Sequence, residues 1–227
     1  MQLLANTTSP YVRIARVSMI EKGLNVEPTI VDPWADDPLL RKANAATRVP
    51  TLITDDGMPL SESLLIVQWL EHLRPAPDWP SLLGRDLGGV SNVSGVLSRA
   101  GIALGVIDAA VHTIIIRKVT APILFDDTPV GLRRRRTMAE GMARLESAAA
   151  QGQLTGNGNG NGNGNGNGNG NGNDASTPTL DAICAVVALD YLRFRFDGQP
   201  WLPDMPALDT LSASLGQRAS FAQTLPR

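Results

Sequence analysis

The chain has 227 residues, of which 43% are hydrophobic and 19% are charged, and its formal net charge is −2. These values are ordinary for a soluble globular protein with enough length to bury a core, and they do not suggest nucleic acid or an anionic membrane as the main partner. No uninterrupted apolar run reaches the roughly 18 residues of a membrane span, and the N-terminus lacks the features of a signal peptide, so we expect a cytoplasmic protein.

The first sixteen residues predict a strand, a turn and the start of a helix. Met1–Ala5 is a short apolar run, and "TTSPYVRIAR" then places Ser9 at an N-cap and Pro10 at the first helical position. We expect this helix to run from Tyr11 to about Lys22 and to end at Gly23. A turn of this kind directs backbone N–H groups and a hydroxyl toward one point in space, where an anion can be held.

The next segments continue the alternation of strands and helices. "VEPTIVD" predicts a strand, "DDPLLRKAN" a short helix or turn, and "VPTLITDDGMPLSES" two strands around an Asp-Gly turn. A helix over Leu64–Leu73 follows, with Ser61 or Ser63 as its cap. The predicted order is β-α-β-α-β-β-α.

A proline-rich connector at residues 77–86 separates this α/β domain, residues 1–76, from an all-helical domain, residues 87–227. A last short helix is expected from Ala207 to about Gly216. Nine Gly-Asn pairs at residues 156–173 offer no apolar side chain to a core, and we expect a disordered loop between two helices there. The helical part is predicted from three apolar seams at helical spacing, which consist of Leu97, Ala100, Leu104, Val111 and Ile115; Met138, Met142, Leu145 and Ala149; and Leu180, Ile183, Cys184, Val187, Ala188 and Tyr191.

The cysteine and histidine content argues against disulfide and metal chemistry. Cys184 is the only cysteine and lies in an apolar helical run, so we interpret it as a buried structural thiol. His72 and His112 have no ligand partner at helical spacing, and we expect no metal site.

Five strings in this order resemble the cytosolic glutathione S-transferase family, in particular bacterial members with a serine at the active site. "TSPYVRIARVSMIEKGL" is similar to the family's first helix, "RVPTL" to its Val-Pro step with a cis proline, and "LSESLLIVQWLEHL" to its Glu-Ser motif. "PTLDAICAVVALDYLRFRF" resembles its buried central helix, and "RASFAQTLP" resembles its usual ending. The resemblance implies a thioredoxin-like N-terminal domain followed by an all-α C-terminal domain, a homodimer, and a transferase that uses glutathione as co-substrate in detoxification.

The sequence departs from the family pattern at two places. The family opens its buried helix with a Ser or Thr cap and an Asp three residues later, whereas here Asp181 follows Thr179 by two. The reciprocal cap is therefore expected to be missing or rearranged. Arg48 stands before Val49, where the family often has lysine.

Glutathione must be a thiolate to attack an electrophile, and the resemblance assigns the stabilising hydroxyl to Ser9. A plain helix cap is the alternative role of Ser9. Thr8 is the nearest competing hydroxyl, and Tyr11 is a weaker candidate because its side chain leaves from the helix body.

The remaining glutathione contacts are expected from Val49, Pro50, Glu62 and Ser63. The Val49 backbone is expected to pair with the cysteinyl part of glutathione, Glu62 with its ammonium, and Ser63 with its γ-glutamyl carboxylate. The alternatives are an ordinary turn at Val49-Pro50 and simple helix capping by Glu62 and Ser63. Arg48 and Lys42 can reach the other carboxylate, but solvated surface charge is the preferred interpretation.

The second substrate is expected between the domains, as a small hydrophobic electrophile, where Asp108 either lines the site or lies at the edge of the seam. The run Arg133–Arg136 is interpreted as a solvated helix face rather than an anion site. Two other functions stay open. One is a glutathione-dependent reductase or lyase, which usually needs a cysteine near position 9, and the other is a non-catalytic glutathione- or ligand-binding module.

Overall fold

The computed structural model describes residues 1–85, 90–120, 124–154, 156–157 and 177–226. The predicted Gly-Asn loop at 156–173 lies outside the described residues, except for Gly156 and Asn157.

The first part of the chain is built on a four-stranded sheet in the order β2-β1-β3-β4. In chain order the elements are β1 (Gln2–Ala5), α1 (Pro10–Glu21), β2 (Pro28–Ile30), α2 (Pro38–Ala43), β3 (Thr51–Ile53), β4 (Pro59–Ser61) and α3 (Ser63–Leu73). β1 pairs in parallel with β2 and antiparallel with β3, and β3 pairs antiparallel with β4. The predicted order of elements is therefore confirmed.

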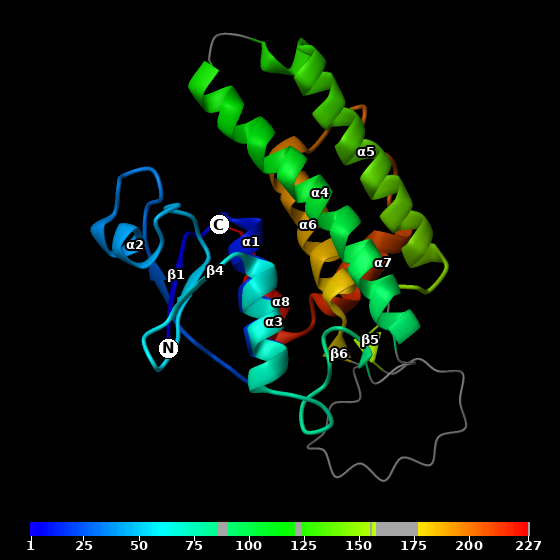
Figure 1. Cartoon of the computed structure of the whole chain (residues 1–227). Coiled ribbons are helices and arrows are strands. Elements are labelled where there is room, and N and C mark those ends of the chain that lie inside the picture. Colours follow the sequence, from blue (N-terminus) through cyan, green and yellow to red (C-terminus); the bar gives the residue numbers. More distant parts are fainter. Residues whose placement is uncertain (86–89, 121–123, 155, 158–176, 227) are drawn as a thin grey trace, which may run out of the picture.

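Helices cover both faces of this sheet because successive residues of a strand point to opposite sides. Leu3 packs with residues of α1 and α3, among them Val12 and Ile66, whereas Leu4 packs with Leu40 of α2. Figure 1 shows α1 and α3 together on one side of the sheet and α2 on the other.

The second part of the chain is helical. It contains α4 (Val90–Thr120), the 3-10 helix η2 (Phe125–Asp127), α5 (Pro129–Ala150), α6 (Leu180–Phe196), α7 (Pro206–Leu215) and α8 (Ala219–Ala222). A two-residue pair, β5 (Gly156–Asn157) with β6 (Thr177–Pro178), lies before α6. α6 packs against α4 and also against α1, so it joins the helical part to the sheet part.

The predicted seams are confirmed in α5 and α6, where Met138, Met142 and Leu145 and all six predicted residues of α6 belong to or pack against the main core. In α4 the seam is wrong at its first position, because Leu97 is 48% exposed. Within the described residues, α4 is long and apolar enough between Asn92 and Thr120 to cross a membrane by length and composition. In this fold it packs against α5 and α6.

The start of α6 replaces the expected reciprocal cap with a bridge to α4. Thr179 is the N-cap of α6, and the buried Asp181 carboxylate accepts hydrogen bonds from Arg99 Nε at 2.7 Å and from the Ala182 N–H at 3.0 Å. Burial is the main cause that raises the pKa of Asp181, against the opposing effects of Thr179 and Arg99.

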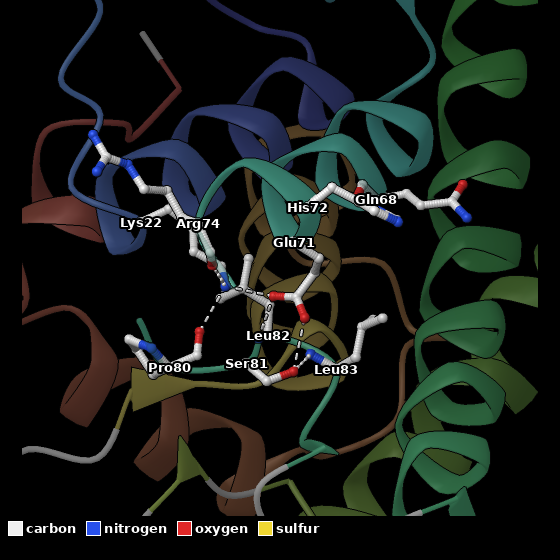
Figure 2. Close-up of polar contacts among 9 residues, drawn as sticks. All are labelled: Lys22, Gln68, Glu71, His72, Arg74, Pro80, Ser81, Leu82 and Leu83. Carbon is white, nitrogen blue, oxygen red and sulfur yellow. Dashed lines mark hydrogen bonds and ion pairs between the residues drawn. The ribbon is translucent and has the colours of Figure 1, made fainter. Parts of the chain in front are cut away.

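A fully buried lysine ties the end of α1 to the connector after α3. Lys22 Nζ lies 2.6 Å from Glu71 Oε1 and donates to the backbone oxygens of Arg74 at 2.9 Å and Pro80 at 2.8 Å. Figure 2 shows these contacts converging on the ammonium group. A buried charge is tolerated only when it is paired and hydrogen-bonded, and here both conditions are met.

Glu71 completes this arrangement from the side of α3. Its carboxylate accepts from the Ser81 hydroxyl at 2.8 Å and from the Leu82 N–H at 2.9 Å, as Figure 2 shows. Residues 80–82 are thereby fixed against α1 and α3. The domain division at residues 77–86 stays a prediction.

Candidate functional site

The turn between β1 and α1 has the predicted cap geometry. Ser9 is the N-cap of α1 with an extended backbone, its Oγ accepts from the Val12 N–H at 3.3 Å, and Pro10 follows at the first helical position. The Ser9 N–H donates to Asn6 Oδ1 at 2.8 Å, which fixes the turn from the other side. Ser9 is half-buried, and these two hydrogen bonds hold it in the turn.

A pocket lies beside this turn, between α1, α6 and the end of the chain. Hydroxyl-bearing residues line much of it. The lining consists of Thr7, Thr8, Ser9, Pro10, Arg13, Val187, Tyr191, Thr224 and Pro226. Thr8 and Ser9 therefore line the same small hollow of about 10 Å³, whereas Val49, Glu62 and Ser63 do not line it.

Arg13 lines this pocket, and no role was predicted for it from the sequence. It is 5% exposed, its guanidinium donates to Asp190 Oδ2 of α6 at 2.6 Å, and its Nε lies 3.4 Å from Thr224 Oγ1. A charged residue on a largely apolar helix was the available signal that a buried partner exists. The pair fixes the first turn of α1 against α6.

Tyr11 and Asp108 connect α1 to α4 next to this turn. The Tyr11 hydroxyl donates to Asp108 Oδ1 at 2.5 Å, and Asp108 is exposed. Burial and then the Asp108 carboxylate raise the pKa of Tyr11 well above its ordinary value, and the charge of Glu62 acts in the same direction. The tyrosine is therefore a neutral donor committed to Asp108.

The Val49-Pro50 bond is cis, as the resemblance implies. Val49 is half-buried and Pro50 is buried, directly before β3. Arg48 is exposed, and its Nη1 lies 3.7 Å from Glu62 Oε1, so these two side chains are neighbours.

The N-cap of α3 differs from the predicted one. Glu62, not Ser61 or Ser63, is the N-cap, and its side chain makes no capping hydrogen bond. Its φ is 69°, a conformation that costs a non-glycine residue about 1–3 kcal/mol and that clusters at ligand sites. Ser63 is the first helical residue and is 4% exposed, so its N–H belongs to the unpaired first turn of α3.

Other chemistry has little support within the described residues. No group of three or more His, Cys, Asp or Glu side chains is arranged there to hold a metal ion. Cys184 is fully buried in α6, and burial raises the pKa of its thiol, so the thiol is an inert part of the core.

Comparison with known proteins gives a consistent result. Residues 3–78 match the family model of the glutathione S-transferase N-terminal domain. The whole chain is 27% identical over 226 residues to an uncharacterized GST-like protein, YibF, of Escherichia coli K12, and the match covers 98% of that protein.

Solved structures of glutathione S-transferases have the same fold. One from Methylobacterium radiotolerans, in complex with glutathione sulfonate, is 27% identical with a TM-score of 0.76 and covers 99% of this chain and 94% of its own. Another from Methylobacillus flagellatus, with glutathione bound, is 26% identical with a TM-score of 0.76 and covers 100% and 99%. The predicted thioredoxin-like domain followed by an all-helical domain is thereby confirmed.

Proposed function

We propose that the chain, which matches the glutathione S-transferase N-terminal domain over residues 3–78, binds glutathione at the start of α1 and transfers the glutathione thiolate to a small hydrophobic electrophile. The bound glutathione or glutathione sulfonate in two structural relatives supports the choice of co-substrate.

The observation that carries this proposal is the hydrogen-bond state of Ser9. A hydroxyl has one proton and two lone pairs, so a Ser9 that accepts from the Val12 N–H can still donate its proton to sulfur. The cap role and the catalytic role are therefore compatible. A cap that lacked a hydroxyl proton, such as aspartate, would repel the thiolate.

The expected decrease in the pKa of the glutathione thiol is large enough to change its ionisation state at neutral pH. The N-terminus of a helix stabilises an anion by about 0.3–1 kcal/mol, and a hydrogen bond to a charged acceptor contributes about 1.5–3 kcal/mol. At 1.36 kcal/mol per unit, the two together lower a thiol pKa of about 8.5 by about two units. The thiolate then becomes the majority form at neutral pH.

The neighbouring hydroxyls differ in how well they suit this role. The proton of Tyr11 is committed to Asp108, which disfavours Tyr11 as the donor to sulfur. Thr8 borders the same pocket as Ser9 and stays the alternative donor.

We propose that Val49, Pro50, Glu62 and Ser63 hold the rest of glutathione. The Arg48–Glu62 ion pair is exposed on both sides, and such pairs contribute only about 0–1 kcal/mol. The γ-glutamyl ammonium can therefore replace Arg48 at Glu62 at little cost. The unpaired N–H groups at the start of α3, beginning with Ser63, suit the adjacent γ-glutamyl carboxylate.

The two other functions are less well supported. A glutathione-dependent reductase or lyase usually needs a cysteine near position 9, and the single cysteine, Cys184, lies in the core of α6. A binding module would hold glutathione without lowering the pKa of its thiol. Turnover of a panel of electrophiles by the purified protein, beside a measurement of glutathione affinity, separates these cases: binding without turnover would contradict a transferase.

We also propose that the protein is a cytoplasmic homodimer that acts in detoxification. Leu64 and Leu65 on α3 and Leu97 on α4 are exposed apolar residues suited to an interface. Light scattering should give twice the 24.1 kDa mass of one chain, and a monomer at micromolar concentration would contradict the assignment.

A further inference from the structure

Exposed aliphatic side chains gather where α4 ends and α5 begins. The four residues are between 49% and 75% exposed, and they are Val119, Leu124, Val130 and Leu132. Figure 1 shows this end of the α4–α5 hairpin projecting beyond the other helices, far from the sheet. Scattered exposed aliphatic residues are ordinary, but a group of four at a projecting tip indicates a contact surface.

The same tip carries a strong local positive charge. Residues 117–136 contain six basic and two acidic side chains, for a net charge of +4, although the whole chain has −2. Asp126 is already paired with Arg117, whereas Lys118, Arg133 and Arg136 are exposed. The small total charge of the chain therefore hides a basic end on an otherwise acidic molecule.

We propose that this apolar-basic tip, formed by Val119, Leu124, Val130 and Leu132 with Lys118, Arg133 and Arg136, docks on the surface of an anionic lipid bilayer. Such a surface provides a partner for both kinds of side chain in the tip: hydrocarbon for the aliphatic residues and negatively charged headgroups for the basic residues. Soluble polyanions match only the charges, so they leave the four aliphatic side chains in water.

A second copy of the chain fits the tip less well than a bilayer does. In a symmetric dimer the same patch faces itself, and two patches of +4 would then be brought together. Repulsion between like charges opposes such a contact, whereas anionic headgroups attract every basic residue of the tip.

The fold supports a peripheral contact rather than insertion. Ala103, Val106, Ile107 and Ala110 of α4 are buried in the helical core, so this part of the helix is already covered by protein. The 3-10 helix η2 packs against α4 and α5, and its Phe125 is buried. Only the last turn of α4 and the exposed face at the start of α5 remain to meet a membrane.

Sedimentation of the full-length protein with vesicles tests the proposal. We expect binding to vesicles of equimolar phosphatidylserine and phosphatidylcholine, weak binding to pure phosphatidylcholine, and loss of the difference in high salt. Arg133→Gln should lower the partition coefficient about fivefold, which is the equivalent of about 1 kcal/mol for one surface charge. Arg144→Gln, an exposed charge farther along α5, is the matched control and should change it less than about twofold.

The aliphatic part is tested by the double variant Val119→Ser with Leu132→Ser, which should lower partitioning at least about tenfold. Ile30→Ser, on β2 of the sheet part, is the control for an exposed aliphatic residue elsewhere. Equal binding to both kinds of vesicle would overturn the proposal. Loss of vesicle binding in the arginine variant but not in the serine variant would also overturn the proposal, because the tip would then bind by charge alone, as it would to a soluble polyanion. A change of oligomeric state in the serine variant would overturn it as well and would assign the tip to a second copy.

Discussion

Lys22 is a fully buried charge, and its replacement by methionine gives a direct stability test of the Lys22–Glu71 pair. The two side chains are 0% and 4% exposed and lie 2.6 Å apart. Removal of one partner of a buried pair leaves the other charge uncompensated and costs about 3–5 kcal/mol. The backbone oxygens of Arg74 and Pro80 also lose their donor.

We therefore expect Lys22→Met to lower the free energy of unfolding in urea by about 3–5 kcal/mol. Lys42→Met, at an exposed position on α2, should change it by less than about 0.5 kcal/mol. The double variant Lys22→Met with Glu71→Gln should cost less than the sum of the single changes by about 0.5–3 kcal/mol, because it removes the orphaned charge. A cost below about 1 kcal/mol for Lys22→Met, or a coupling energy near zero, would refute the reasoning.

Three further outcomes follow from the contacts of single side chains. Tyr11→Phe removes the bond to Asp108 and should leave the pH profile of turnover in place, whereas a shifted profile would make Tyr11 the donor to sulfur. Cys184 should react with a disulfide reagent only at the rate of unfolding, and fast labelling of the folded protein would contradict its burial. Burial raises the pKa of Asp181, so its carboxyl group stays protonated to a higher pH in the folded protein than in the unfolded chain. The free energy of unfolding should therefore fall as the pH rises above about 3.9, the pKa of aspartate in an unfolded chain. Asp181→Asn should remove that part of the pH dependence, and an unchanged slope would show that Asp181 does not cause it.

The elements that could be predicted from the sequence are those with local causes. Ser9 and Pro10 define the start of α1, and Gly57 has the positive φ that the Asp-Gly turn needs. In α6, every residue of the predicted apolar seam is buried. Such signals lie within a few residues of each other. The short α8 was not predicted, because four residues are too few for a periodic pattern.

The partners of the site residues could not be predicted, because they are distant in the chain. Arg13 meets Asp190 across 177 positions, and Tyr11 meets Asp108 across 97. The N-cap of α3 was missed for another reason, since Glu62 has a positive φ that sequence preference disfavours.

The central claim, that Ser9 stabilises the thiolate, is tested most directly by titration of the thiol of bound glutathione through its ultraviolet absorbance in the wild-type protein and in Ser9→Ala. We expect the thiol pKa to be about two units below that of free glutathione in the wild type, and to rise by about one to two units in Ser9→Ala with little change in glutathione affinity. Thr8→Ala is the matched control and should leave the pKa in place. If Thr8→Ala raises the pKa instead, the donor is Thr8. If neither substitution moves it, and Ser9→Ala costs only the roughly 1 kcal/mol of a lost helix cap, the proposed stabilisation of the thiolate is contradicted.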